Sequence, residues 1–244
     1  IELIWFDTPG NIPQKYAEKL VEVVHRNQPR ALVSGRIGYN LGDYQTLGDM
    51  EVPPENINGL WESVDVTNDA WGYAWYDQNW KSPKQILKYL ISTIARGGTY
   101  MLNIGPDGTG KMDEEQVERL RQAGEWLSKY GETLYGLRGG PVIADRWGGT
   151  TYRDNIVYVH ILEWEKDQIT FEIPGNTMEK WEVISGGKAE LTEENGTFSI
   201  SVPIPERDSI DTILKLTFAE PIVWEGCKGR ENDVYGLADG LKEE

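Results

Sequence analysis

The period of the hydrophobic pattern changes at about Gly139, and this change limits the folds open to the chain. Before it, short apolar runs alternate with stretches whose apolar residues recur every three or four positions, as in amphipathic helices. After it, apolar and polar residues alternate in short segments separated by turn residues. We therefore expect an α/β part over residues 1–137, an antiparallel β-sandwich over residues 138–224 and a polar tail over residues 225–244.

Three helices are expected in the α/β part, over residues 13–28, 82–96 and 113–130. The third has the strongest pattern, because its first turn is acidic, its last turn is basic and a glycine follows it. A Ser-Pro pair at the start of the second is typical of a capped helix.

Four strands are expected around these helices. The first, Ile1 to Asp7, has the apolar run of a fully buried parallel strand whose carboxyl end presents Asp7. The others cover residues 30–36, 60–65 and 99–105, with a long polar loop over residues 37–58. Such strands fit either an open doubly wound sheet or part of an eight-stranded barrel. No Gly-rich phosphate-binding pattern follows any of them, which disfavours a nucleotide-binding fold.

The charge balance excludes several classes of partner. The 244 residues include 40 Asp and Glu against 24 Lys and Arg, a formal charge of −16 that repels phosphate backbones and anionic lipid surfaces. Neither nucleic acid nor a membrane is therefore an expected partner. The single Cys227 precludes an internal disulfide, and His25 and His160 are too few and too scattered for a metal site. No metal and no cofactor are expected, and the composition leaves the cellular compartment open.

Charged and aromatic residues collect at the ends of the expected strands, where α/β folds place their chemistry. Asp7 and Arg36 end the first two strands, and Glu62 lies in the third. Two carboxylates with aromatic platforms and one cation are the equipment of a retaining glycosidase, in which one acid attacks the anomeric carbon and the other protonates the leaving oxygen. An Asp at a strand end can equally start a turn or cap a helix, so position alone leaves the role of Asp7 open.

Six motifs resemble, in their order along the chain, those of the α-L-fucosidases of glycoside hydrolase family 29. They are Leu3-Ile4-Trp5-Phe6-Asp7, Val33-Ser34-Gly35-Arg36, Gly42-Asp43-Tyr44-Gln45-Thr46, Trp61-Glu62, Trp71-Gly72-Tyr73, and the run from Gly97 to Gly108. The resemblance extends from residue 1 to about Gly136. It implies an α/β partial (β/α)8-type barrel followed by an all-β antiparallel sandwich domain. It also implies a retaining exo-α-L-fucosidase that hydrolyses terminal α-L-fucosides through a covalent fucosyl-enzyme intermediate.

The same resemblance implies roles for single residues. Asp7 corresponds to the nucleophile, while Trp5, Arg36 and Trp71 would lie in or beside the fucose pocket. Glu62, in the Trp-Glu pair, is expected to be the acid/base.

The acid/base position keeps two reserves. Many members of the family have a Glu in a Thr-Pro-Glu segment, where this sequence has Thr46-Leu47-Gly48-Asp49. Asp49 and Glu51 therefore remain alternatives to Glu62.

The family's first barrel strands, with paired-His and His-Trp sugar-binding motifs, lie upstream of the aspartate strand, and no residues precede Ile1 in this sequence. Neither His25 nor His160 can replace those histidines. We therefore expect a complementary N-terminal barrel chain or self-association, and near-inactivity of the isolated chain on fucosylated glycans. The alternative is a non-catalytic half barrel and sandwich that binds glycans or a protein partner. The presence or absence of a companion polypeptide with the His-rich strands would distinguish the catalytic hypothesis from the non-catalytic one.

Overall fold

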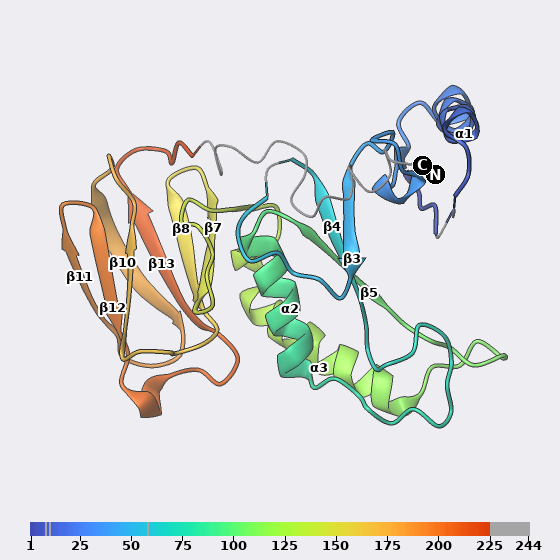
Figure 1. Cartoon of the computed structure of the whole chain (residues 1–244). Helices are drawn as coiled ribbons and strands as arrows, with labels where there is room; N and C mark the ends of the chain where they lie inside the picture. The colour runs from blue at the N-terminus through green and yellow to red at the C-terminus, as the bar shows by residue number, and fades with distance from the viewer. Residues whose placement is uncertain (8, 10, 58, 225–244) are drawn as a thin grey trace.

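A computed structural model of the chain describes residues 1–7, 9, 11–57 and 59–224, and the expected polar tail lies outside these residues. An α/β part and an antiparallel β part lie side by side, with helices between their sheets (Figure 1). None of the helices in the described ranges combines the length and the apolar character that a membrane span needs.

The strands of the α/β part pair in parallel and follow the order of the chain. β1 (Leu3–Ile4) pairs with β2 (Leu32–Val33), and β3 (Gln45–Asp49), β4 (Trp61–Val66) and β5 (Thr99–Asn103) form a second sheet in that order. A parallel bridge between Ser34 and Tyr44 joins the two sheets. Neighbouring strands are therefore also consecutive in the sequence.

Two of the strand predictions were wrong. The segment 37–58, expected to be a polar loop, contains β3, whose sequence Gln-Thr-Leu-Gly-Asp has one apolar residue and a Gly and so lacks a clear period of two. The first strand is also shorter than predicted and is not fully buried, since the side chain of Leu3 is 38% exposed. An apolar run predicts that both faces of the strand are buried. Here only one face is packed, and on that side Phe6 and Val33 contact the first helix.

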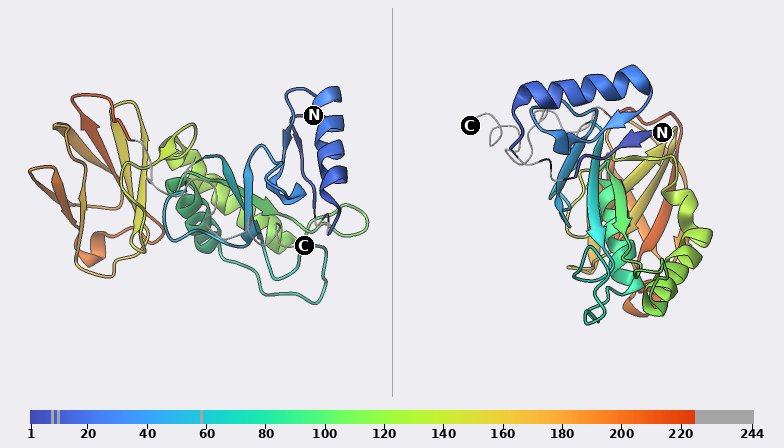
Figure 2. Two further views of the ribbon diagram at one scale, coloured as in Figure 1. Left: turned by 45° about the horizontal axis from the view of Figure 1, so that its top comes forward. Right: turned by 90° about the vertical axis from the view of Figure 1, so that its right-hand side faces the viewer.

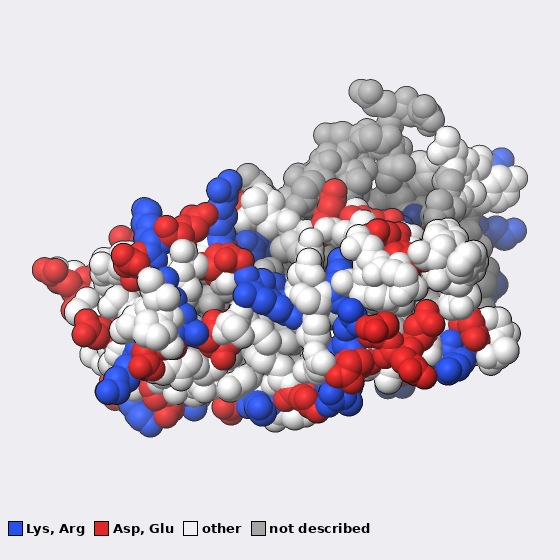
Figure 3. All heavy atoms as spheres, turned by 90° about the horizontal axis from the view of Figure 1, so that it is seen from below, with Lys and Arg blue, Asp and Glu red and all other residues white. Residues whose placement is uncertain are grey.

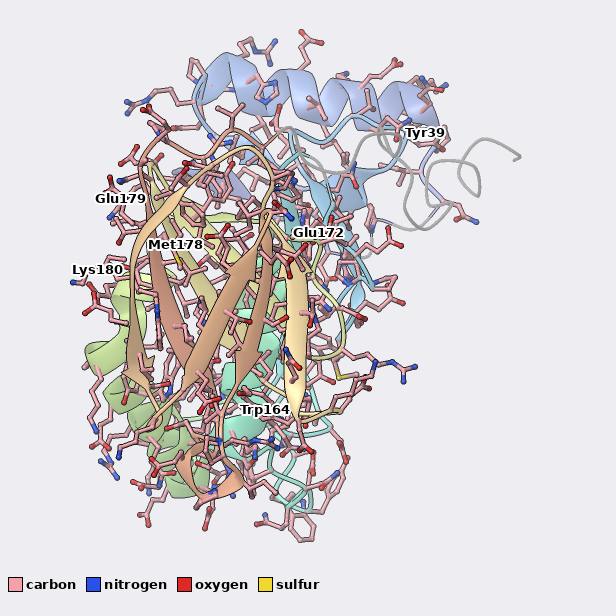
Figure 4. All side chains as sticks on the ribbon, turned by 90° about the vertical axis from the view of Figure 1, so that its left-hand side faces the viewer. Tyr39, Trp164, Glu172, Met178, Glu179 and Lys180 are labelled. Carbon is pink, nitrogen blue, oxygen red and sulfur yellow. The ribbon has the colours of Figure 1, made fainter. Side chains whose placement is uncertain are left out.

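The three predicted helices are confirmed as α1 (Gln14–Asn27), α2 (Pro83–Ala95) and α3 (Glu114–Tyr130). α2 begins with a reciprocal cap: the Ser82 hydroxyl accepts from the Gln85 N–H at 3.2 Å, and the Gln85 side-chain oxygen accepts from the Ser82 N–H at 2.8 Å. α1 lies at the end of the molecule away from the antiparallel sheets (left view of Figure 2). Beside α1, the Tyr39 hydroxyl donates to the Ile12 carbonyl (Figure 4).

The antiparallel part is a two-sheet sandwich. One sheet has the order β10-β13-β8-β7-β6 and the other β11-β12-β9. The strands are β6 (Arg138–Gly139), β7 (Gly148–Arg153), β8 (Ile156–Ile161), β9 (Gln168–Glu172), β10 (Met178–Ser185), β11 (Glu190–Glu194), β12 (Thr197–Ser201) and β13 (Thr212–Phe218). Figure 4 looks onto this end, with Met178, Glu179 and Lys180 of β10 on the left and Glu172 of β9 above Trp164.

Alternation located five of these strands, and β6, β7 and β11 were missed because their apolar residues are too few to alternate. Inside the sandwich, the rings of Phe171 and Phe198 stack with their centroids 5.6 Å apart. Asn195 and Gly196 both have positive φ, 53° and 81°, as the tight hairpin turn between β11 and β12 requires.

A second core joins the sandwich to the helices. Leu87 and Ile91 of α2 and Trp126 of α3 pack with Tyr158 and Ile213 of the sandwich. The same junction contains a buried polar network. His160 Nδ1 lies 2.7 Å from Asp211 Oδ2, and the Thr151 hydroxyl donates to the Thr133 carbonyl at 2.7 Å. Burial raises the pKa of the Asp211 carboxyl against the opposing effect of His160. His160 is therefore a packed structural residue, far from the strand ends of the α/β part.

Candidate active site

The end of β1 and the start of β4 meet through one hydrogen bond. Trp5 follows β1, and its indole N–H donates to Glu62 Oε1 at 2.7 Å. Glu62 is the second residue of β4, pairs in register with Thr46 of β3 and is only 8% exposed. A carboxylate this buried needs hydrogen-bond donors, and Trp5 supplies one of them.

Arg36 extends this pair to two further carboxylates. It lies in a short 3-10 turn, Gly35–Ile37, just after β2, not in the strand as predicted, because the strand ends at Val33. Its guanidinium lies over the Trp5 ring, 4.7 Å from the centroid. Nη1 is 3.7 Å from Asp7 Oδ1, and Nη2 donates to Asp49 at the end of β3. One cation thus connects the carboxylates from two different strands.

The structure brings together most of the residues that the sequence singled out. Trp5, Asp7, Arg36, Asp49 and Glu62 form one connected cluster, with Trp5 and Asp7 after β1, Arg36 after β2, Asp49 at the end of β3 and Glu62 near the start of β4. The side chain of Asp7 is 71% exposed, so a ligand in solution can reach its carboxylate.

Two of the candidates are held elsewhere. The Glu51 carboxylate accepts from the Gly48 N–H at 3.1 Å, across its own turn. Trp71 lies in the loop after β4, where its carbonyl accepts from the Asn103 amide at 2.6 Å and its ring is 42% exposed. Neither contact is part of the cluster around Arg36.

Trp61, adjacent to Glu62, belongs to the opposite face of β4 because side chains alternate along a strand. It is 2% exposed and packs with Leu47 and Ile57, and its indole N–H donates to the Arg96 carbonyl at 3.3 Å. Its burial makes Trp61 a packing residue and not a sugar platform.

Tyr44 and Thr46 complete the surroundings of Glu62, and the sequence assigned no role to either. Both are 8% exposed, and in the described part of the chain neither hydroxyl makes a hydrogen bond. The Tyr44 hydroxyl lies near Glu62 and Trp5. Burial, and then the negative charge of Glu62, raise the pKa of Tyr44 well above its usual value. Tyr44 and Thr46 are two residues apart, a spacing that places both side chains on one face of an extended segment. This spacing could have drawn attention to them, but no strand was predicted there.

Within the described ranges, no group of three or more His, Cys, Asp or Glu side chains is arranged to hold a metal ion. His25 on α1 contacts Asp43 Oδ2 at 3.0 Å. The cluster itself offers three carboxylates, one guanidinium and an indole N–H.

Comparison with known proteins identifies the family of the chain. The model of the α-L-fucosidase family matches residues 1–132, more than half of the chain, and the chain belongs to this family, glycoside hydrolase family 29.

Curated relatives are fucosidases of greater length. The chain is 29% identical to the tissue alpha-L-fucosidase of Rattus norvegicus over 186 residues, which cover 69% of this chain and 40% of that protein. It is 28% identical to the Homo sapiens tissue enzyme over 225 residues, 83% of this chain and 47% of that protein. The chain thus spans less than half the length of these relatives.

Solved structures share the fold. An alpha-L-fucosidase from Vibrio sp. strain EJY3 matches with a TM-score of 0.79 and 24% identity, over 89% of this chain and 42% of that one. Isoenzyme 1 from Paenibacillus thiaminolyticus matches with a TM-score of 0.77 and 23% identity, over 90% and 58%. A Bacteroides thetaiotaomicron GH29 enzyme, a trapped covalent intermediate in complex with 2-fluoro-fucosyl fluoride, matches with a TM-score of 0.75 and 19% identity, over 89% and 56%.

The packing behind Glu62 can be tested at Gly98. A Cβ at this position would lie 2.4 Å from the buried Trp61 ring, so Gly98→Ala must displace the ring and the adjoining strand. We expect a loss of about 1–3 kcal/mol in the free energy of unfolding, measured by urea denaturation. The matched control is Gly124→Ala on α3, where nothing lies within 4 Å of the added Cβ. This control should gain about 0.5–1 kcal/mol. Equal stabilities of the two variants would contradict the packing role of Trp61.

Proposed function

We propose that this chain carries the nucleophile and the acid/base of a retaining α-L-fucosidase that removes terminal α-L-fucosyl groups from glycans. The observation that carries the proposal is the cluster in which Arg36 contacts Asp7 while Trp5 links Arg36 to Glu62. In a chain of this family, such a cluster supplies the two carboxylates that the reaction needs.

In the proposed mechanism, Asp7 attacks the anomeric carbon while Glu62 protonates the leaving glycosidic oxygen, giving a covalent fucosyl-enzyme intermediate. Glu62 then takes a proton from water, whose oxygen displaces Asp7. The exposure of Asp7 suits its role, because the nucleophile must reach the sugar. The Bacteroides neighbour, trapped as a covalent intermediate, supports the same course by analogy.

Further residues have proposed roles in binding. The rings of Trp5 and Trp71 present apolar surface to the sugar, and Arg36 orients Asp7 and offers donors to a sugar hydroxyl. Asp49 is the first reserve for the acid/base, since Arg36 binds it in the same cluster. Glu51 is the weaker reserve, because its carboxylate is bound within its turn.

We propose that residues 1–137 are the later strands of a (β/α)8-type barrel and residues 138–224 a separate sandwich domain. Sequential parallel order is the order of barrel strands, whereas doubly wound sheets reverse theirs at a switch point. Exposed apolar side chains at the outer strands and on α1 support a missing neighbour: Leu3 and Leu32 are 38% and 40% exposed, and Tyr16 and Leu20 are 52% and 40% exposed.

The proposed partner is the remaining part of the barrel, on the same or on a separate polypeptide, or a second copy of the chain. Such a partner would cover these side chains and the open edge of β1. Nucleic acid and membranes are not proposed as partners. On the face seen in Figure 3, acidic and basic side chains are interspersed, which suits a neutral sugar better than a polyanion.

A second candidate is glycan binding without catalysis. The loop after β4 carries four exposed aromatic residues, Trp71, Tyr73, Trp75 and Tyr76, whose exposed fractions are 42%, 46%, 75% and 74%. Aromatic faces of this kind can stack on sugars without any reaction.

The nucleophile is tested by Asp7→Gly in the complemented enzyme. Turnover of aryl fucosides should fall by orders of magnitude while fucose binding persists, and added azide should restore turnover with release of a fucosyl azide, because azide occupies the space of the missing carboxylate. Asp167→Gly, at an exposed position of the sandwich, is the matched control. An Asp7→Gly variant that kept more than about a tenth of the wild-type rate would refute the assignment.

The acid/base is tested by Glu62→Gln. Substrates with poor leaving groups should lose far more kcat/KM than activated aryl fucosides, since only the former need a proton in the first step. Asp49→Asn and Glu51→Gln provide the comparison in the same assay. Equal losses on both substrate types for Glu62→Gln would indicate a binding role, and selective loss in Asp49→Asn would transfer the assignment to Asp49.

The need for a partner is tested with purified residues 1–244. Positioning of a substrate can contribute about 7–11 kcal/mol to lowering a barrier, so a half-formed pocket should be nearly inactive. We expect the chain to run as an oligomer, or with a second polypeptide, in light scattering with size exclusion, and fucosidase activity to follow that complex. A monodisperse monomer that turns over about once per second or faster would refute this expectation.

A further inference from the structure

Glu62 has two carboxylate oxygens, and the structure commits one of them. Oε1 accepts the Trp5 indole N–H at 2.7 Å, and this N–H can only donate. A donor facing Oε1 favours that oxygen as the unprotonated, carbonyl-type one. In the protonated form of Glu62, the transferable proton therefore resides on Oε2.

Tyr44 is a buried group close to this carboxylate. Its hydroxyl lies near Glu62 and, in the described part of the chain, makes no hydrogen bond of ordinary geometry. Leaving a buried hydroxyl unpaired costs free energy, so such a group commonly has a function. A tyrosine hydroxyl can donate to a carboxylate and accept from a carboxylic acid, which suits a neighbour whose protonation alternates.

The backbone at Tyr44 is held by strand pairing. Tyr44 forms the parallel bridge with Ser34 that joins the two sheets, and the residue is 8% exposed. Tyr44 directly precedes β3 and lies two residues before Thr46, so in extended backbone both side chains point to the same side, and Thr46 is the register partner of Glu62 on β4.

We propose that Tyr44 is a positioning residue for Glu62, whose hydroxyl holds Oε2 through both proton transfers while Trp5 holds Oε1. This inference rests on the proposed function. In the first step the Glu62 proton passes to the leaving oxygen as the bond from that oxygen to the anomeric carbon breaks and the bond to Asp7 forms. In the second, Glu62 takes a proton from water as the water oxygen replaces Asp7. Tyr44 keeps its own proton throughout.

The experiment compares Tyr44→Phe with wild type in the complemented enzyme, using aryl fucosides with good and poor leaving groups. Loss of a hydrogen bond to a charged group should lower kcat/KM about 10-fold for poor leaving groups and about 2-fold or less for activated ones. The alkaline limb of the pH profile should move to higher pH, because the ionised carboxylate has lost a donor. Tyr100→Phe, which removes a bond to Asp65 on the other face of β4, is the matched control and should leave that limb in place.

A double variant separates positioning from packing. In a Glu62→Gln background, Tyr44→Phe should have no further effect, since the group that it positions no longer transfers a proton. The same loss in both backgrounds, or an unmoved alkaline limb, would overturn the role of Tyr44 and leave the proposed function intact. A shift of the limb in Thr46→Val but not in Tyr44→Phe would likewise overturn it in favour of Thr46. Failure of the wild-type complex to hydrolyse fucosides would overturn the proposed function, and this inference with it.

Discussion

The burial of α2 on two sides is the constraint on which the rest of the structure depends. Leu87, Ile91 and Ala95 are fully buried, and the helix packs on α3 and β5 on one side and on β6 and β7 on the other. Complete burial of side chains such as Leu87 and Ile91 contributes about 1.5–3 kcal/mol each. One helix thereby holds the parallel sheet and the sandwich in a common core, and the sandwich serves as a support for the strands that carry the candidate site.

The site itself depends on how β2, β3 and β4 align. The bridge between Ser34 and Tyr44 and the pairing of Thr46 with Glu62 place one face of β3 beside Glu62. Alternation along β4 then sends Trp61 to the opposite face, where it packs with Leu47. The adjacent residues Glu62 and Trp61 therefore differ in role: Glu62 takes part in the proposed chemistry, and Trp61 packs on the other face of the sheet. A shift of one residue in the register of β4 would exchange the faces on which the two side chains lie.

The positive charge of Arg36 also organises the cluster. Arg36 contacts Asp7 and Asp49 and lies over the Trp5 ring, while Trp5 binds Glu62. A single cation among carboxylates from different strands offsets the repulsion between them and orients each one. The proposed reaction needs such an arrangement, because a nucleophile and an acid must be held at the same sugar ring.

The sequence by itself determined the class of each half and indicated the residues of the proposed chemistry. The acidic start and basic end of α3, the Ser-Pro cap of α2 and the alternation of β8 and β13 are local patterns with one strong interpretation, and the motifs around Asp7, Arg36 and Glu62 pointed to a fucosidase-like site. Only the tertiary structure decided that β3 is a strand, that Trp61 packs and that Tyr44 faces Glu62. Gln45–Asp49 becomes a strand because β4 pairs with it, and a pairing between distant segments leaves no period in the sequence of either.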